Sequence, residues 1–172
     1  NSMLISLNDH LKVHEVFDIF KDNNTSGILR MEYFENKFYF SENNTGVMGT
    51  NGPLASNRLI IYDKKEDTIE YIELSSDYPY GIFLDKDNRN IIIQHYALYV
   101  ANHVHTIYSI DDNSFSEISF NENSEIDRLP KIGSEYYEFK FDENYYRYNI
   151  KKAEMEKYSF DVNIPSITSQ IF

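Results

Sequence analysis

The chain has 172 residues, of which 41% are hydrophobic and 16% aromatic, and it carries a formal net charge of −12 with no cysteine. These values fit one domain over residues 1–172 with a sizeable core, and they exclude a disulfide framework and a thiolate metal site. The charge disfavours nucleic acid and anionic membranes as partners and is compatible with a basic protein partner, although it also fits a role in solubility alone. The sequence has no membrane-spanning run or signal-peptide core, which favours a cytoplasmic protein.

Residues 1–27 are interpreted as an N-terminal cap segment. From Leu7 to Phe20 the apolar side chains roughly follow helical spacing, although Val13 and Ile19 interrupt the stripe. The pattern favours a short helix slightly over a strand. A run of turn-forming residues then ends the segment before the first clear strand.

From residue 28 onward the sequence predicts β-strands separated by turn signals. Short runs rich in Ile, Tyr and Phe are typical of strands, and clusters of Asp, Asn and Gly mark the turns. A Gly- and Asn-rich loop is expected over 41–57 and a tail over 161–172. The expected strands are Ile28–Phe34, Lys37–Phe40, Arg58–Asp63, Ile69–Leu74, Tyr80–Leu84, Asn90–His95, His105–Ile110, Phe115–Phe120, Ser134–Phe141, Tyr145–Ile150 and Met155–Phe160, with a weak one at Arg128–Ile132.

Three stretches of the chain repeat one pattern, and they begin at Tyr62, Tyr108 and Tyr148, 46 and 40 residues apart. In each, a short polar residue suited to closing a turn follows the tyrosine, and a large apolar residue lies seven positions after it. Spacing of about 40–50 residues is typical of propeller blades, each a four-stranded antiparallel sheet. About three such units fit into residues 28–160. The polar residues are Asp63, Ser109 and Asn149, and the apolar ones are Ile69, Phe115 and Met155.

The repeats predict an all-β protein of antiparallel, blade-like sheets. A closed propeller needs at least about four blades, so three units favour an open or incomplete propeller, or a meander, with open edges that also allow a homodimer. The repeated aromatic residue, polar turn and second strand resemble the outer half of a kelch-type blade over residues 28–160, although the Gly-Gly pair and the Trp of kelch repeats are absent. This resemblance implies blade geometry and no function.

The composition of the whole chain resembles that of bacterial immunity proteins from contact-dependent inhibition and related polymorphic toxin systems. The runs at 43–45, 88–93 and 143–146 show this likeness in a chain that is small, acidic and rich in Asn, Ile, Tyr and Phe. The resemblance implies a cytosolic inhibitor of a cognate toxin. Because these families share no catalytic motif, it implies no residue roles.

Three histidines form the first group with a chemical interpretation. His103 and His105 share one face of a predicted strand, and His95 lies on a neighbouring strand. Three histidines suit zinc, but no carboxylate or further histidine completes a diagnostic spacing. Interface or partly buried histidines are the favoured interpretation, and no metal or other cofactor is expected.

Carboxylates occur in close groups that resemble acid–base pairs. With 28 acidic residues in the chain such groups are inevitable, and those in turn clusters have a local structural role. No nucleophile elbow, phosphate-binding loop or dinucleotide fingerprint is present, so the protein is not expected to be an enzyme. The groups are Asp85 with Asp87, Asp111 with Asp112, and Glu122 with Glu125 and Asp127.

Blade geometry predicts a partner-binding face where the loops between blades meet those inside each blade. Tyrosines there supply rigid amphipathic contact area and carboxylates meet Lys and Arg, although the tyrosines also fit a role in covering the blades' own core. We therefore predict a cytosolic immunity protein that binds a basic toxin domain and occludes its active site, with a nuclease as the favoured class of toxin. The alternative is a noncatalytic blade-repeat scaffold or ligand-binding module. The predicted partner-binding residues are Asp77, Tyr78, Tyr80, Tyr96, Tyr99, Glu122, Glu125 and Asp127.

Overall fold

The computed structural model describes residues 4–7, 13–17, 28–42, 48–49, 52–53, 57–76, 78–95, 103–120, 131–141 and 144–158. The chain forms two compact units, Asn1–Asn123 (unit 1) and Ser124–Phe172 (unit 2). All secondary structure of the described residues is β, and every strand pairing is antiparallel, which confirms the predicted all-β class. The assignment of residues 1–172 to one domain stays a prediction.

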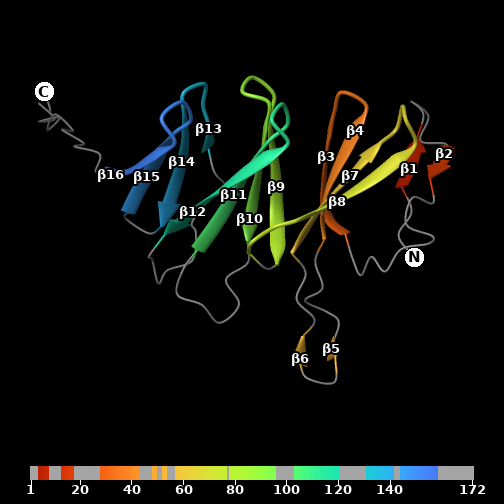
Figure 1. Ribbon diagram of the computed structural model, residues 1–172, viewed down its shortest axis with the longest axis horizontal. Helices are drawn as coiled ribbons and strands as arrows, with labels where there is room; N and C mark the ends of the chain where they lie inside the picture. Colours follow the sequence, from red (N-terminus) through yellow and green to blue (C-terminus); the bar gives the residue numbers. More distant parts are fainter. Residues whose placement is uncertain are drawn as a thin grey trace, which may run out of the picture. The chain divides into compact units, whose positions relative to one another are not determined.

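Unit 1 contains two open four-stranded sheets, each with its strands in chain order (Figure 1). In each sheet the first two strands and the last two strands are joined by short turns, which makes the sheets blade-like, as the repeat spacing predicts. Sheet I consists of β3 (Ile28–Phe34), β4 (Lys37–Glu42), β7 (Arg58–Asp63) and β8 (Thr68–Glu73). Sheet II consists of β9 (Pro79–Asp85), β10 (Asn90–His95), β11 (His103–Ser109) and β12 (Ser114–Phe120).

Two short ribbons lie outside these sheets. β1 (Leu4–Leu7) pairs with β2 (Val13–Phe17), and β5 (Met48–Gly49) pairs with β6 (Gly52–Pro53). The predicted N-terminal helix is therefore wrong for residues 13–17. Two β-branched valines in five residues favour extended backbone, and so short a helix is unstable without strong packing. The predicted 41–57 loop is likewise interrupted by the β5–β6 ribbon.

Unit 2 contains sheet III, again four strands in chain order. It consists of β13 (Lys131–Ile132), β14 (Tyr136–Phe141), β15 (Asn144–Asn149) and β16 (Glu154–Tyr158). The weak first strand predicted for this unit is confirmed at its last two residues. Residues 128–130 and the tail lie outside the described residues.

The three sequence repeats are the outer hairpins of the three sheets. In each, the tyrosine pairs directly with the large apolar residue seven positions later. The sixth residue of each repeat has left-handed backbone, with φ between 51° and 53° at Asp67, Asn113 and Ala153. The polar second residue accepts a backbone N–H of the turn in all three, which confirms its predicted role. These acceptors are Asp63 Oδ1, Ser109 Oγ and Asn149 Oδ1.

A second equivalence joins the two turns within each sheet. The third residue of every repeat donates its N–H to a carbonyl of the inner turn: Lys64 to Asn36 at 2.8 Å, Ile110 to Arg89 at 3.0 Å and Ile150 to Glu135 at 3.0 Å. The inner and outer turns therefore lie at the same end of the strands of each sheet. We call this end the turn edge, a term that does not refer to an outer strand. The three sheets are repeats of one local design.

The core of unit 1 lies between sheet I and sheet II, where β9 packs beside β3 and β4. Tyr39 and Tyr108 face each other across this core with ring centroids 6.4 Å apart. Burial raises the pKa of Tyr39 to about 12 and also raises the pKa of Tyr108, so both phenols stay neutral at neutral pH. The remaining buried residues of this cluster are Leu59, Ile61, Leu74, Ile82, Ile91 and Ile93.

Candidate partner-binding surfaces

The structure describes two residues of the predicted partner-binding face. Tyr78 precedes β9 in a left-handed conformation, with φ 53°, and is half-buried, whereas Tyr80 is 40% exposed. Pro79 between them is buried and pairs with His95. Tyr80 therefore has the exposure that a binding residue needs. The other six, Asp77, Tyr96, Tyr99, Glu122, Glu125 and Asp127, lie outside the described residues.

His95 and His105 are buried on opposite faces of sheet II. His95 Nε2 lies 2.8 Å from Thr106 Oγ1, and the His105 ring lies edge-on to Phe120 with 5.6 Å between ring centroids. Thr106 and His105 are neighbours in β11, so their side chains point to opposite faces. The two imidazoles cannot share a metal ion, and within the described ranges no three His, Asp or Glu side chains are grouped to hold one. The side chain of His103 lies outside the described part.

Asp85 closes the β9–β10 turn. Its carboxylate is 3% exposed and accepts hydrogen bonds from Asp87 N and Asn88 N, both at 3.1 Å, and from Asn88 Nδ2 at 2.8 Å. Asp112 Oδ2 similarly accepts from Ser109 Oγ at 3.0 Å. The local structural role predicted for Asp85 is therefore confirmed, because its carboxylate holds the turn through three hydrogen bonds.

Arg89 links three turns of unit 1 at the turn edge. Its Nη1 and Nη2 donate to Glu35 at 2.6 and 2.8 Å, and its Nε donates to Asp111 at 2.7 Å. The guanidinium also lies 5.2 Å from the Phe34 ring centroid. The hydrogen bonds from Arg89 lower the pKa of Glu35. Sheets I and II are thus joined by a charged clamp as well as by their core.

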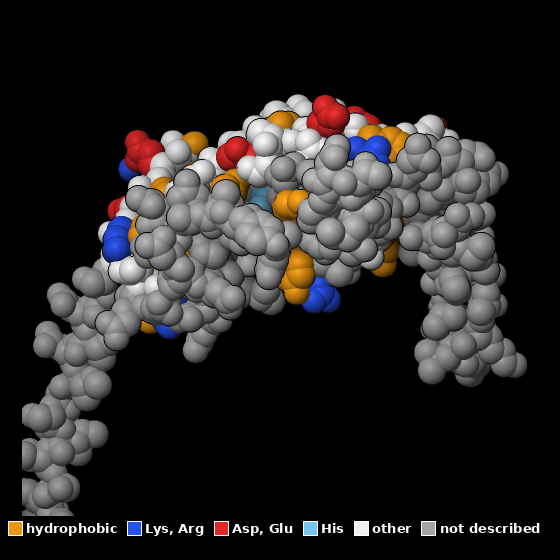
Figure 2. Space-filling view, turned by 90° about the horizontal axis from the view of Figure 1, so that it is seen from below, with side chains coloured by type: hydrophobic (Ala, Val, Ile, Leu, Met, Phe, Trp, Pro, Cys, Tyr) orange, Lys and Arg blue, Asp and Glu red, His pale blue; other side chains and the backbone are white. Residues whose placement is uncertain are grey.

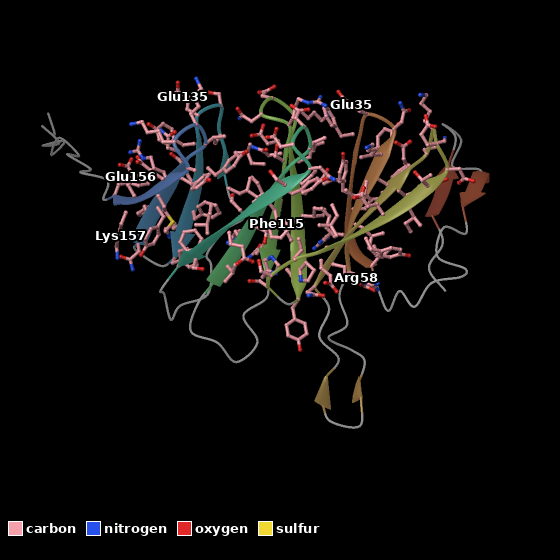
Figure 3. The ribbon with its side chains drawn as sticks, viewed as in Figure 1. Glu35, Arg58, Phe115, Glu135, Glu156 and Lys157 are labelled. Atoms are coloured by element: carbon pink, nitrogen blue, oxygen red, sulfur yellow. The ribbon has the colours of Figure 1, made fainter. Side chains whose placement is uncertain are left out.

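Glu42 and Arg58 form a bidentate ion pair away from the turn edge, and Figure 3 labels Glu35 and Arg58 near opposite edges of unit 1. The two bonds measure 2.5 and 2.6 Å, and Arg58 lies 4.8 Å from the Tyr71 ring centroid. The hydrogen bond to Glu42 raises the pKa of Arg58. Because Glu42 is 1% exposed, the pair neutralises a charge that burial otherwise makes costly.

The two faces of sheet III differ in chemistry. One face carries Tyr137, Phe139 and Phe141, each at most 2% exposed. On the other face Arg147 lies between two tyrosines, 4.4 Å from the Tyr158 ring centroid and 5.2 Å from that of Tyr136. Glu156 is the cross-strand partner of Arg147, and its Oε1 lies 3.2 Å from Arg147 Nε. This second face, which we call the Tyr–Arg face, has the residue types that protein interfaces favour.

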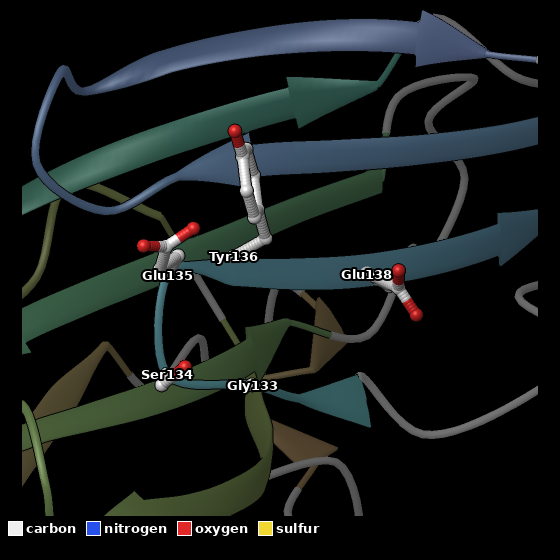
Figure 4. A pocket seen from close by; sticks show the side chains of 5 residues that line it. All are labelled: Gly133, Ser134, Glu135, Tyr136 and Glu138. Atoms are coloured by element: carbon white, nitrogen blue, oxygen red, sulfur yellow. The ribbon is translucent and has the colours of Figure 1, made fainter.

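A hollow of about 200 Å³ lies beside the first turn of sheet III (Figure 4). Gly133 N donates to Tyr136 O at 3.0 Å, and this bond holds the turn next to β14. The hollow is shallow and lacks the enclosed apolar lining of a small-molecule site. It is lined by Gly133, Ser134, Glu135, Tyr136 and Glu138.

The chain matches no protein-family model. No curated protein matches it either. Within the described residues no helix is long and apolar enough to cross a membrane. The interpretation of the surfaces therefore rests on their own chemistry.

Charge is distributed unequally between the two units. Unit 1 contains 19 acidic and 9 basic residues, a net charge of −10, whereas unit 2 contains 9 and 7, a net charge of −2. Figure 2 shows red carboxylates at several separate places on the described surface, with blue Lys and Arg side chains beside some of them. A long-range attraction for a basic partner thus belongs mainly to unit 1.

Sequence reasoning did not single out the three stacked arginines, Arg58, Arg89 and Arg147. The available signal was weak, because each is a lone cation in or beside a strand, and such residues are usually solvated. Their stacking partners Phe34, Tyr71 and Tyr158 lie on other strands, so only pairing across the sheets brings them together.

Proposed function

We propose that this protein is a cytoplasmic immunity protein that binds a basic toxin domain and occludes its active site. A nuclease is the favoured class of toxin. The observation that supports the proposal most is the charge of −10 on unit 1. A nuclease needs a cationic cleft to hold its substrate, and an acidic protein surface complements such a cleft.

The mechanism combines electrostatic steering with steric block. Attraction between the partners raises the association rate above the unsteered range of about 10⁵–10⁶ per molar per second, and salt removes that gain. Exposed tyrosines such as Tyr80 supply the contact area that holds the complex after encounter.

The test is co-expression with the toxin domain encoded by the adjacent upstream gene. We expect toxicity of the domain alone, growth rescue by this protein, and a co-purifying complex that salt weakens. Toxicity without rescue or complex would reject the immunity function and favour a noncatalytic blade-repeat binding module.

Paired variants locate the binding face. Asp77→Lys with Glu122→Lys should weaken binding about tenfold or more at low salt. The matched control reverses two exposed carboxylates of unit 2, Glu135→Lys with Glu154→Lys, and should change the affinity less than about threefold. Equal effects of the two pairs would reject the predicted face.

A further inference from the structure

The outer strands of the three sheets differ in how well they are protected against strand addition. β8, β12 and β16 each lie at the end of a sheet, and an end strand presents unpaired backbone N–H and C=O groups. β12 is the longest of the three, with seven residues. Its residues 114–117 and 119 are exposed, so much of this edge is accessible to a partner.

Alignment of the repeats shows what β12 lacks. At the eighth position after the repeat tyrosine, β8 has Glu70 and β16 has Glu156, whereas β12 has Ser116. β16 adds Glu154 and Lys157, and Figure 3 labels Glu156 and Lys157 on that strand. β12, Ser-Phe-Ser-Glu-Ile-Ser-Phe, has one charge and no proline or glycine. Charges on edge strands oppose pairing with other chains, so β12 is the least protected edge.

The surroundings of β12 favour one kind of added strand. Phe115, labelled in Figure 3, is 40% exposed and offers an apolar contact for a side chain beside the edge. Glu117 on the strand and Asp112 in the adjoining turn are exposed carboxylates, whereas Asp111 beside them is already paired with Arg89. An incoming segment therefore needs an extended backbone, an apolar side chain for Phe115 and basic side chains for the carboxylates.

We propose that an extended, basic segment of the toxin domain adds to the outer edge of β12 as a fifth strand of sheet II. This inference rests on the proposed function and specifies its main contact. The backbone hydrogen bonds supply affinity, and Phe115 with the neighbouring carboxylates supplies selectivity. A second copy of this chain fits the same edge poorly, because two chains of net charge −12 repel each other.

Amide hydrogen exchange of the labelled protein, free and bound to the toxin domain, tests the proposal directly. Successive N–H groups of an edge strand alternate between the partner strand and solvent, so alternate amides of β12 should exchange about tenfold or more slowly in the complex. The amides of β8 and β16 should not change. A complex that leaves β12 unprotected, or protects β8 or β16 instead, overturns the inference alone; absence of any complex rejects the proposed function and the inference together.

A matched pair of side-chain variants gives the second test. Phe115→Ser should weaken toxin binding about tenfold, as expected for a central apolar contact. Met155→Ser changes the equivalent repeat position of β16, where the residue is 39% exposed, and should leave affinity within about twofold. Equal affinity of the two variants contradicts the assignment of β12.

Proline separates backbone from side-chain effects. Ser116 and Glu117 are neighbours in β12, so the N–H of one points to β11 and the N–H of the other points outward. Of the variants Ser116→Pro and Glu117→Pro, the one that removes the inward N–H should unfold sheet II, and the other should fold. The variant that folds should lose toxin binding at least about tenfold. Full binding by that folded variant rules out strand addition.

Discussion

The outer hairpins β11–β12 and β15–β16 share a left-handed sixth residue in the turn and differ in the side chain at that position. Both begin with a tyrosine and hold the sixth residue at φ 51° or 53°. In β11–β12 the Tyr108 hydroxyl donates to Asn113 Oδ1. In β15–β16 the sixth residue is Ala153, which offers no side-chain oxygen to Tyr148. The β7–β8 hairpin follows the first pattern, with Tyr62 donating to Asp67 at 2.9 Å.

The difference shows that the shape of the turn does not depend on the hydrogen bond from the tyrosine hydroxyl to the sixth residue. We call this hydrogen bond the tyrosine lock. The polar second residue and the link to the inner turn form in all three hairpins, so they suffice for the shape. The tyrosine lock needs Asp or Asn at the left-handed position, where these residues are also tolerated best. Ala153 adopts that conformation at a cost of roughly 1–2 kcal/mol.

The largest expected effect comes from removing the ring of Tyr108. Tyr108→Ala should lower the free energy of unfolding by about 3–5 kcal/mol, because the residue is 3% exposed and packs in the unit 1 core. Phe115→Ala, which truncates its exposed cross-strand partner, should cost less than about 1 kcal/mol. Urea unfolding followed by circular dichroism measures both, and similar losses would contradict the burial contrast.

Removing only the hydroxyl tests the tyrosine lock. Tyr108→Phe should cost about 0.5–1.5 kcal/mol, because Asn113 Oδ1 loses its buried donor. Tyr148→Phe should change the unfolding free energy by only a few tenths of a kcal/mol, since Ala153 provides no acceptor. Equal costs in the two hairpins would show that the lock contributes nothing to stability.

Installing the missing residue should make the third hairpin like the others. Ala153→Asn relieves the left-handed backbone and provides an acceptor for Tyr148, so it should stabilise β15–β16 by about 0.5–1 kcal/mol. Amide exchange of β15 and β16 reports this locally. Asn113→Ala is the reciprocal control and should destabilise β11–β12. A loss of protection in Ala153→Asn would contradict the equivalence of the turns.

The smallest effect concerns the clamp between turns and depends on pH. Arg89 lowers the pKa of Glu35, so the stabilisation is present above the usual value of 4.5 and is lost as pH falls through the lowered pKa. The Tm difference between the unaltered protein and Arg89→Gln should be largest near neutral pH and shrink as the pH falls through the lowered pKa of Glu35. Lys65→Gln, which removes an exposed pair with Glu66, should show little difference at any pH. A difference independent of pH would contradict the role of the Glu35 charge.

Most of the strands were predictable because their signals are local. β3, β7 and β10 have the predicted bounds, and most other strands differ by one or two residues at an end. The predicted N-terminal helix was wrong over Val13–Phe17 because a short apolar run fits a helix and a strand equally well until its pairing partner is known. The predicted partner-binding face remains a prediction, and the structure describes only Tyr78 and Tyr80 among its eight residues.

The sequence by itself determined the hairpins, since a tyrosine, a polar turn residue and a left-handed position act over six consecutive residues. It also determined the charge of −12 and the β class. Only the tertiary structure decided which tyrosines are buried, that Arg89 joins three turns and that Arg147 is stacked. These features depend on residues far apart in the chain, and such contacts form only once strands are paired and faces are chosen.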